Sequence, residues 1–154
     1  MNALIINIGI YQVAWFLCVF FGNFGALLSL PILILHLFLL PHRSKDLQMM
    51  GALLLIGLIA DGTLHLSGMI SFTQTGIPIP AWLMVIWIAL ALLPHHSLKW
   101  MKGRPILSSL FGAFGGPLAY WAGVKAGAAE FSQPLIPSLL LLGLIWAIIW
   151  PAAM

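Results

Sequence analysis

The sequence predicts an all-α integral membrane protein, a bundle of about six transmembrane helices with almost nothing outside the bilayer. Two observations carry this prediction: 62% of the 154 residues are hydrophobic, and only 6% are charged. A soluble domain has roughly 25% charged residues, so six Lys or Arg and three Asp or Glu cannot cover a globule of this size in water. We therefore expect lipid to be the main solvent and residues 1–154 to form one transmembrane domain.

Breaks at Gly, Pro and charged residues divide the chain into six apolar segments. A helix needs about 20 apolar residues to cross the hydrocarbon, with a range of roughly 17 to 25. The predicted spans are roughly 3–21, 26–40, 47–71, 81–98, 106–124 and 134–153. The second span is short and contains Pro31, so the sequence leaves open whether it crosses the membrane fully.

Each boundary between these spans has a local cause. The first span ends at residues 22–25 (GNFG), a tight-turn composition, and the second ends at the polar run 41–46. The third span is long enough to tilt, and the uncharged loop 72–80 follows it. The fourth span kinks or ends at Pro94, and the basic loop 99–105 separates it from the fifth.

Loop charges predict the orientation of the bundle. The basic residues after the second span are Arg43 and Lys45, and those after the fourth are Lys99, Lys102 and Arg104. The first and third loops carry no Lys or Arg. Because two spans separate the basic loops, both loops lie on one side of the membrane, which the positive-inside rule identifies as the cytoplasm. Both chain termini are then also expected in the cytoplasm.

Charge and cysteine content exclude several classes of function. The net charge is +3, but no run of basic residues can follow a phosphate backbone, so nucleic acid is not an expected partner. The single cysteine, Cys18, excludes an internal disulfide and a multi-cysteine zinc site. The N-terminal segment lacks the basic region of a signal peptide, and a second apolar segment follows at once. Any chemistry is therefore expected within the membrane or at its edge.

Asp61 is the polar residue that most needs an explanation. It lies near the middle of the third span, where a charged residue costs about 2.5–3.5 kcal/mol even on the insertion scale. We therefore expect Asp61 to face the bundle interior, where it is partnered or protonated. His65 lies on the same helical face, four residues on, and His36 lies at a similar depth, roughly 15 Å from the outer end of the second span. These positions predict that His36 or His65 is a hydrogen-bond partner of Asp61.

Two interpretations of this cluster stay open. In the functional one, Asp61, His65 and His36 are catalytic residues, either around a metal or as a general acid and base. In the structural one, a carboxylate–imidazole pair links helices through hydrogen bonds worth about 0.6 kcal/mol on average. The chain contains no HxxxH or HExxH pattern, so the sequence assigns neither a metal nor a cofactor.

Further polar residues are candidate ligand-binding residues: Tyr11, His95, His96 and Tyr120. Tyr11 shares the depth of Asp61. One of the two histidines reaches toward Asp61 if Pro94 opens the helix, and the other faces the headgroups; the alternative is that both form an interfacial cap. Trp15 and Trp87 lie nearer the core, where they either pack or line an apolar ligand pocket.

Small residues recur at every fourth position of the fifth span. The two runs are Ser108, Gly112 and Gly116, then Ala119, Gly123 and Gly127. This spacing lets helix backbones approach closely, so we expect Gly112 and Gly116 to face another helix. The alternative is that a break at Gly115, Gly116 and Pro117 exposes backbone carbonyls to a ligand cavity.

Three stretches of the chain resemble a known family. They are Asp61 with Gly62, residues 94–100 (PHHSLKW) and residues 112–123 (GAFGGPLAYWAG). They are similar to a family of small polytopic bacterial inner-membrane proteins catalogued as a domain of unknown function, and the resemblance covers nearly the whole chain. It implies a multi-pass protein of the bacterial cytoplasmic (inner) membrane. It also implies an association with fatty-acid modification, through enzymes that resemble cyclopropane-fatty-acid synthases, but it supplies no catalytic residues.

We therefore predict a lipid-related function. The protein is expected to bind or modify a lipid or other apolar molecule at the intramembrane His/Asp/Tyr cluster, with Asp61 as acid or base. One alternative is a non-enzymatic membrane anchor or accessory subunit for a lipid-modifying enzyme. A third is a proton-coupled carrier. Membrane lipids are the expected partners; the sequence leaves enzymatic activity, the substrate and a homo-oligomer open.

Overall fold

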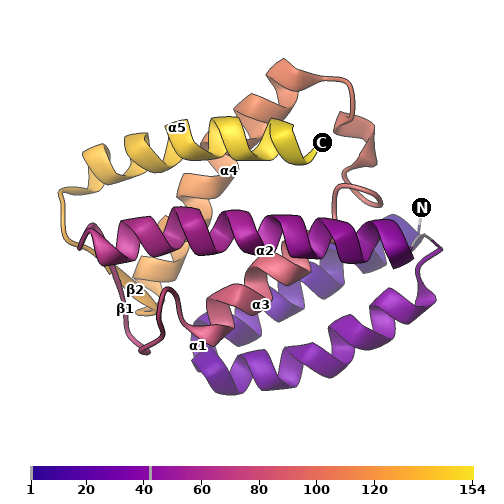
Figure 1. The fold of residues 1–154 in the computed structure, drawn as a ribbon, viewed down its shortest axis with the longest axis horizontal. Helices are drawn as coiled ribbons and strands as arrows, with labels where there is room; N and C mark the ends of the chain where they lie inside the picture. Colours follow the sequence, from indigo (N-terminus) through magenta and orange to yellow (C-terminus); the bar gives the residue numbers. More distant parts are fainter. Residues whose placement is uncertain (1, 42) are drawn as a thin grey trace.

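The computed structural model describes residues 2–41 and 43–154 and shows an all-α fold, as predicted. The elements in chain order are α1 (Asn2–Leu39), α2 (Arg43–Leu66), β1 (Ile70–Phe72), α3 (Ala81–Leu90), the 3-10 helix η1 (Lys99–Met101), α4 (Pro105–Lys125), β2 (Ala129–Phe131) and α5 (Leu135–Ala153). Helix α4 packs along α5, whereas α3 packs against α1 and α2 (Figure 1). The helices therefore form two groups, α1 with α2 and α3, and α4 with α5, and a functional site can lie between them.

Helix α1 is a hairpin of two antiparallel limbs, 2–21 and 23–39 (Figure 1). The break is at Gly22, whose φ of 57° and ψ of −133° suit a residue without a Cβ. Gly25 lets the limbs approach, because a Cβ there would overlap the backbone of Leu17. The predicted turn at residues 22–25 is confirmed, and the limbs correspond to the predicted spans 3–21 and 26–40.

Asn23 connects the hairpin turn to the start of α3. Its backbone N–H donates to Oε1 of Gln74 at 2.7 Å, and its Oδ1 accepts from the backbone N–H of Trp82 at 3.2 Å. The N-cap residue of α3 is Pro80, which has no side chain able to accept this hydrogen bond. The start of the second limb thus caps a helix almost sixty residues later in the chain.

The third and fourth predicted spans differ from the helices observed. Helix α2 runs from Arg43 to Leu66 rather than 47–71, because residues 70–72 leave the helix to form β1. Strand β1 pairs antiparallel with β2, with Ser71 opposite Glu130. Three-residue strands have too little periodicity to be read from sequence. Helix α3 ends at Leu90 instead of residue 98, and residues 91–98 form turns around Pro94.

The surface of the helices supports membrane residence. Three helices are long and apolar enough to cross a membrane: α1 over Ala3–Leu39, α2 and α5. Their outward faces carry many exposed Leu, Ile and Phe side chains, which water would not tolerate at this density. At about 1.5 Å per residue, the ten residues of α3 cover roughly 15 Å, so α3 alone does not cross. The predicted count of six spans is not confirmed by these lengths.

Helix α4 packs on α5 through the predicted small residues. A Cβ at Gly116 would overlap the indole ring of Trp146, and one at Gly112 would overlap the backbone oxygen of Trp146. Both glycines are buried. The prediction that Gly112 and Gly116 face another helix is confirmed.

We expect Gly116→Leu to lower the stability of the protein in detergent by about 1–3 kcal/mol, because the new side chain overpacks the α4–α5 contact. The measurement is thermal unfolding followed by circular dichroism. Gly51→Leu is the matched control, since a Cβ at Gly51 meets nothing within 4 Å. Equal melting temperatures for the two variants would contradict this packing.

Candidate functional site

Asp61 is buried in the interior, as predicted, and it connects three helices. Only 1% of its surface is exposed. Its Oδ2 accepts a hydrogen bond from Nε1 of Trp87 on α3 at 2.7 Å, and its Oδ1 accepts one from the hydroxyl of Tyr120 on α4. The carboxylate of α2 is therefore satisfied by one donor from each group of helices.

The predicted pairing of Asp61 with a histidine is wrong. In the described chain, Nδ1 of His65 contacts the backbone oxygen of Ile70 at 3.2 Å, and its ring lies against Phe72. Nε2 of His36 contacts the side-chain nitrogen of Asn7 at 2.9 Å. His65 therefore bonds the strand that follows α2, and His36 bonds the first limb of α1. The catalytic roles proposed for Asp61, His65 and His36 stay predictions.

Trp87 is the partner of Asp61 that sequence reasoning missed. Its indole packs over Gly57, one turn before Asp61 on α2, where a Cβ would overlap the ring. Its other face stacks on Trp146 of α5, with ring centroids 5.1 Å apart and planes 10° apart. Gly116 lies against the ring of Trp146, so each indole of the stacked pair packs on a glycine. A usable signal existed: a buried indole N–H needs an acceptor, and Asp61 was the carboxylate expected deep in the membrane.

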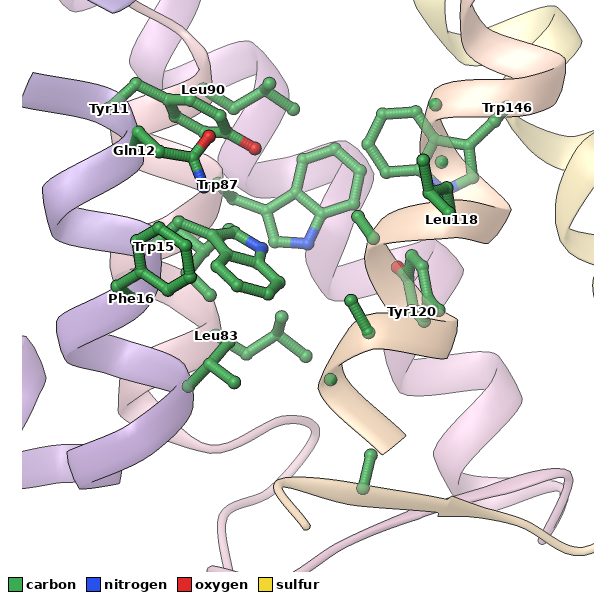
Figure 2. A pocket seen from close by; sticks show the side chains of 18 of the residues that line it. Tyr11, Gln12, Trp15, Phe16, Leu83, Trp87, Leu90, Leu118, Tyr120 and Trp146 are labelled. Carbon is green, nitrogen blue, oxygen red and sulfur yellow. The ribbon is translucent and has the colours of Figure 1, made fainter. Parts of the chain in front are cut away.

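A groove of about 460 Å³ lies beside this network, between the first limb of α1, α3 and α4. Figure 2 shows Tyr11, Gln12, Trp15 and Phe16 on one side and Leu118 and Tyr120 on the other. Trp87 lies between the two sides, and Trp146 lies on the side of Leu118 and Tyr120. No charged side chain of the described residues lines the groove. Two of the four predicted ligand-binding residues, Tyr11 and Tyr120, therefore meet at one cavity.

His95 and His96 lie elsewhere, on the buried carboxylate of Asp46. Nε2 of His96 is 3.0 Å from both oxygens of Asp46, and Nδ1 of His95 is 3.3 Å from one of them. The prediction that one histidine reaches Asp61 is wrong, because Asp46 belongs to the first turn of α2 and lies inside the bundle rather than in a loop.

Asn7 extends this second polar cluster to the first limb of α1. Its Oδ1 accepts from the hydroxyl of Ser97 at 2.6 Å, and its Nδ2 donates to the backbone oxygen of Leu92 at 3.2 Å. Among the described residues, no group of three or more His, Cys, Asp or Glu side chains is arranged to hold a metal ion. The many hydrogen bonds of this cluster indicate a structural role: they hold the turns at 91–98 against α1 and α2.

The comparisons with known proteins assign a family but no activity. The chain matches, over residues 4–152, the model of a family described as "Protein of unknown function (DUF2878)". The chain belongs to this family. The match confirms the resemblance to a family catalogued as a domain of unknown function. No curated protein and no solved structure is significantly similar to this member of the family.

We expect Asp61→Leu to destabilise the protein strongly, because it leaves the Trp87 N–H and the Tyr120 hydroxyl buried without an acceptor. Each such group costs about 1–3 kcal/mol. Asp61→Asn, which keeps one acceptor oxygen, is expected to cost less. Thermal unfolding in detergent measures both, with Thr63→Ala on the exposed face of α2 as control. An Asp61→Leu variant as stable as the control would show that the network contributes little.

Proposed function

We propose that the protein holds a lipid or other apolar molecule in the groove between α1, α3 and α4. The observation that supports this most directly is the groove itself: about 460 Å³, lined mainly by aromatic and aliphatic side chains and open at one side. That volume lies in the range of roughly 300–1,000 Å³ typical of small-molecule sites.

The position of the groove suggests how a ligand enters. The first limb of α1 and α4 stand on opposite sides of it (Figure 2), and both carry exposed apolar side chains next to the opening. In the proposed membrane setting this opening faces hydrocarbon. A molecule dissolved in the bilayer then enters from the side without crossing water.

In this proposal Asp61 is a positioning residue. It does not line the groove, but it holds two residues that do, Trp87 and Tyr120. An enzymatic version of the function, with Asp61 as acid or base, would have to act through Tyr120, because its hydroxyl bonds the carboxylate and its side chain lines the groove. The binding function needs no such step and is the one we favour.

We also propose a setting: a multi-pass protein of the bacterial cytoplasmic membrane, with both termini in the cytoplasm. The end of α5, the connection from α1 to α2 and η1 lie toward the same end of the bundle as the N-terminus (Figure 1). The exposed cations Lys45, Lys99, Lys102 and Arg104 lie in these connections, as the positive-inside rule requires of a cytoplasmic face. In this arrangement the two limbs of α1, then α2, α4 and α5 cross the membrane, and α3 with the turns after it completes a sixth segment. The same basic face is where a soluble lipid-modifying enzyme would dock if the protein is an accessory subunit.

The groove predicts a specific co-purifying molecule. We expect mass spectrometry of lipid extracts from the purified protein to show one apolar species retained in near-stoichiometric amount. Gly115→Leu combined with Ala119→Leu should remove it, because both positions line the groove and a Cβ at Gly115 makes only an ordinary contact, 3.9 Å from Phe111. Gly51→Leu, outside the groove, should retain it. Identical extracts from all three proteins would refute the binding function.

The orientation predicts the location of both chain ends. Fusions of a reporter active only in the cytoplasm, placed at each terminus in turn, should both be active, because the basic connections are retained on that side. A reporter inserted after Gln74, in the uncharged loop, should be inactive. An inactive C-terminal fusion together with an active N-terminal fusion would rule out an even number of crossings.

A further inference from the structure

We infer that the groove selects an uncharged lipid whose polar head is a flat ring bearing carbonyl groups, as in a quinone. This inference rests on the proposed binding function and specifies its ligand. Three properties of the groove wall support it: the lining residues carry no charge, many of them are aromatic, and several hydrogen-bond donors have no protein partner.

The first property is the absence of charge. None of the described residues that line the groove is Asp, Glu, Lys, Arg or His. Asp61 lies behind the wall with its oxygens engaged by Trp87 and Tyr120. A charged headgroup taken from water into such a site without an opposite charge is strongly disfavoured. The groove therefore discriminates against fatty-acid carboxylates and phospholipid phosphates.

The second property is the density of aromatic rings. Ten of the 24 lining residues are aromatic, in a chain in which aromatic residues make up 12%. Figure 2 shows Tyr11 and Trp15 of α1 across from Trp146, with the indole of Trp87 between them. Aromatic rings gain additional energy when they stack on other flat rings, whereas a saturated chain gains only from burial. The wall therefore fits a planar head better than an acyl chain alone.

The third property is the set of donors without partners. Tyr11 and Gln12 line the groove, and no hydrogen bond joins either side chain to another described residue. Trp150 also lines it, but its indole N–H, which has no acceptor among the described residues, is itself buried. A hydroxyl or an amide can donate, so the donors available to a ligand are those of Tyr11 and Gln12. Carbonyl oxygens are neutral acceptors that satisfy such donors, and a hydrocarbon has none.

Three probes with unbranched tails of nine or ten carbons separate these properties: a decyl-substituted benzoquinone, decyl acetate and decanoate. Five tryptophans line the groove, so quenching of tryptophan fluorescence reports quinone binding in detergent, and recovery of fluorescence reports its displacement by the other two probes. We expect the quinone to bind at least about tenfold more tightly than decyl acetate, and decanoate to bind most weakly.

Variants identify the polar contacts. Tyr11→Phe and Gln12→Leu should each weaken quinone binding by about two- to tenfold, the effect of losing one neutral hydrogen bond. Neither change should alter the melting temperature, because neither side chain bonds to another described residue. Gln48→Leu, on the exposed face of α2, is the matched control and should bind the quinone like the unmodified protein. The doubly filled variant, Gly115→Leu with Ala119→Leu, corrects for quenching by quinone that is merely dissolved in the micelle.

The outcomes of these experiments distinguish a failure of the inferred head group from a failure of the proposed binding function. If decanoate or decyl acetate binds as tightly as the quinone, the inferred head group is wrong although the groove still binds lipid. Quinone binding unaffected by Tyr11→Phe and Gln12→Leu would overturn the donor assignment. If none of the three probes binds and no lipid co-purifies, the binding function itself fails.

Discussion

The hydrogen bonds of one carboxylate, Asp61, hold the two groups of helices in register. Trp87 of α3 and Tyr120 of α4 both donate to this carboxylate, so a single side chain of α2 links the group α1–α3 to the pair α4–α5. An isolated carboxylate in hydrocarbon is so unfavourable that these donors are needed wherever the chain folds in lipid. The same requirement positions Trp87 and Tyr120 as neighbouring walls of the groove. The cavity is thus a geometric consequence of satisfying Asp61, together with the small residues of α4 that leave the space open.

Glycine on α4 serves two purposes. Gly112 and Gly116 allow Trp146 and Trp150 of α5 to pack closely, and these two glycines and Gly115 also line the groove, where they leave space in place of a side chain. A stripe of small residues on a helix therefore indicates either close packing against a neighbouring helix or an open groove, and the position of the neighbouring helix determines which of the two forms. Of the two interpretations that the sequence left open, the close helix contact is confirmed, and the break at Gly115, Gly116 and Pro117 is wrong, because α4 is continuous from Pro105 to Lys125.

Much of the fold could be predicted from sequence because its causes are local. The hairpin at Gly22, the buried side of Asp61 and the packing of Gly116 each follow from a residue and its immediate neighbours. The predicted depth of His36 was wrong, because the second limb of α1 is short: His36 lies near the end of that limb and bonds Asn7 in the cluster beside Asp46, not beside Asp61. The paired strands and the burial of Asp46 depend on partners fifty or more residues away, which no local pattern records.

The two acids of α2 have a mechanical consequence. Asp46 is tied to the turns after α3 and Asp61 to α3 itself, so α2 and α3 are fastened at both ends and cannot slide apart without breaking buried hydrogen bonds. Helices α4 and α5 have close contacts with each other and join the rest through Tyr120, the stack of Trp146 on Trp87 and the short β1–β2 ladder. If the groove widens to admit a ligand, α4 and α5 move together as one unit about the β1–β2 strands, and the hydrogen bond from Tyr120 to Asp61 must break first.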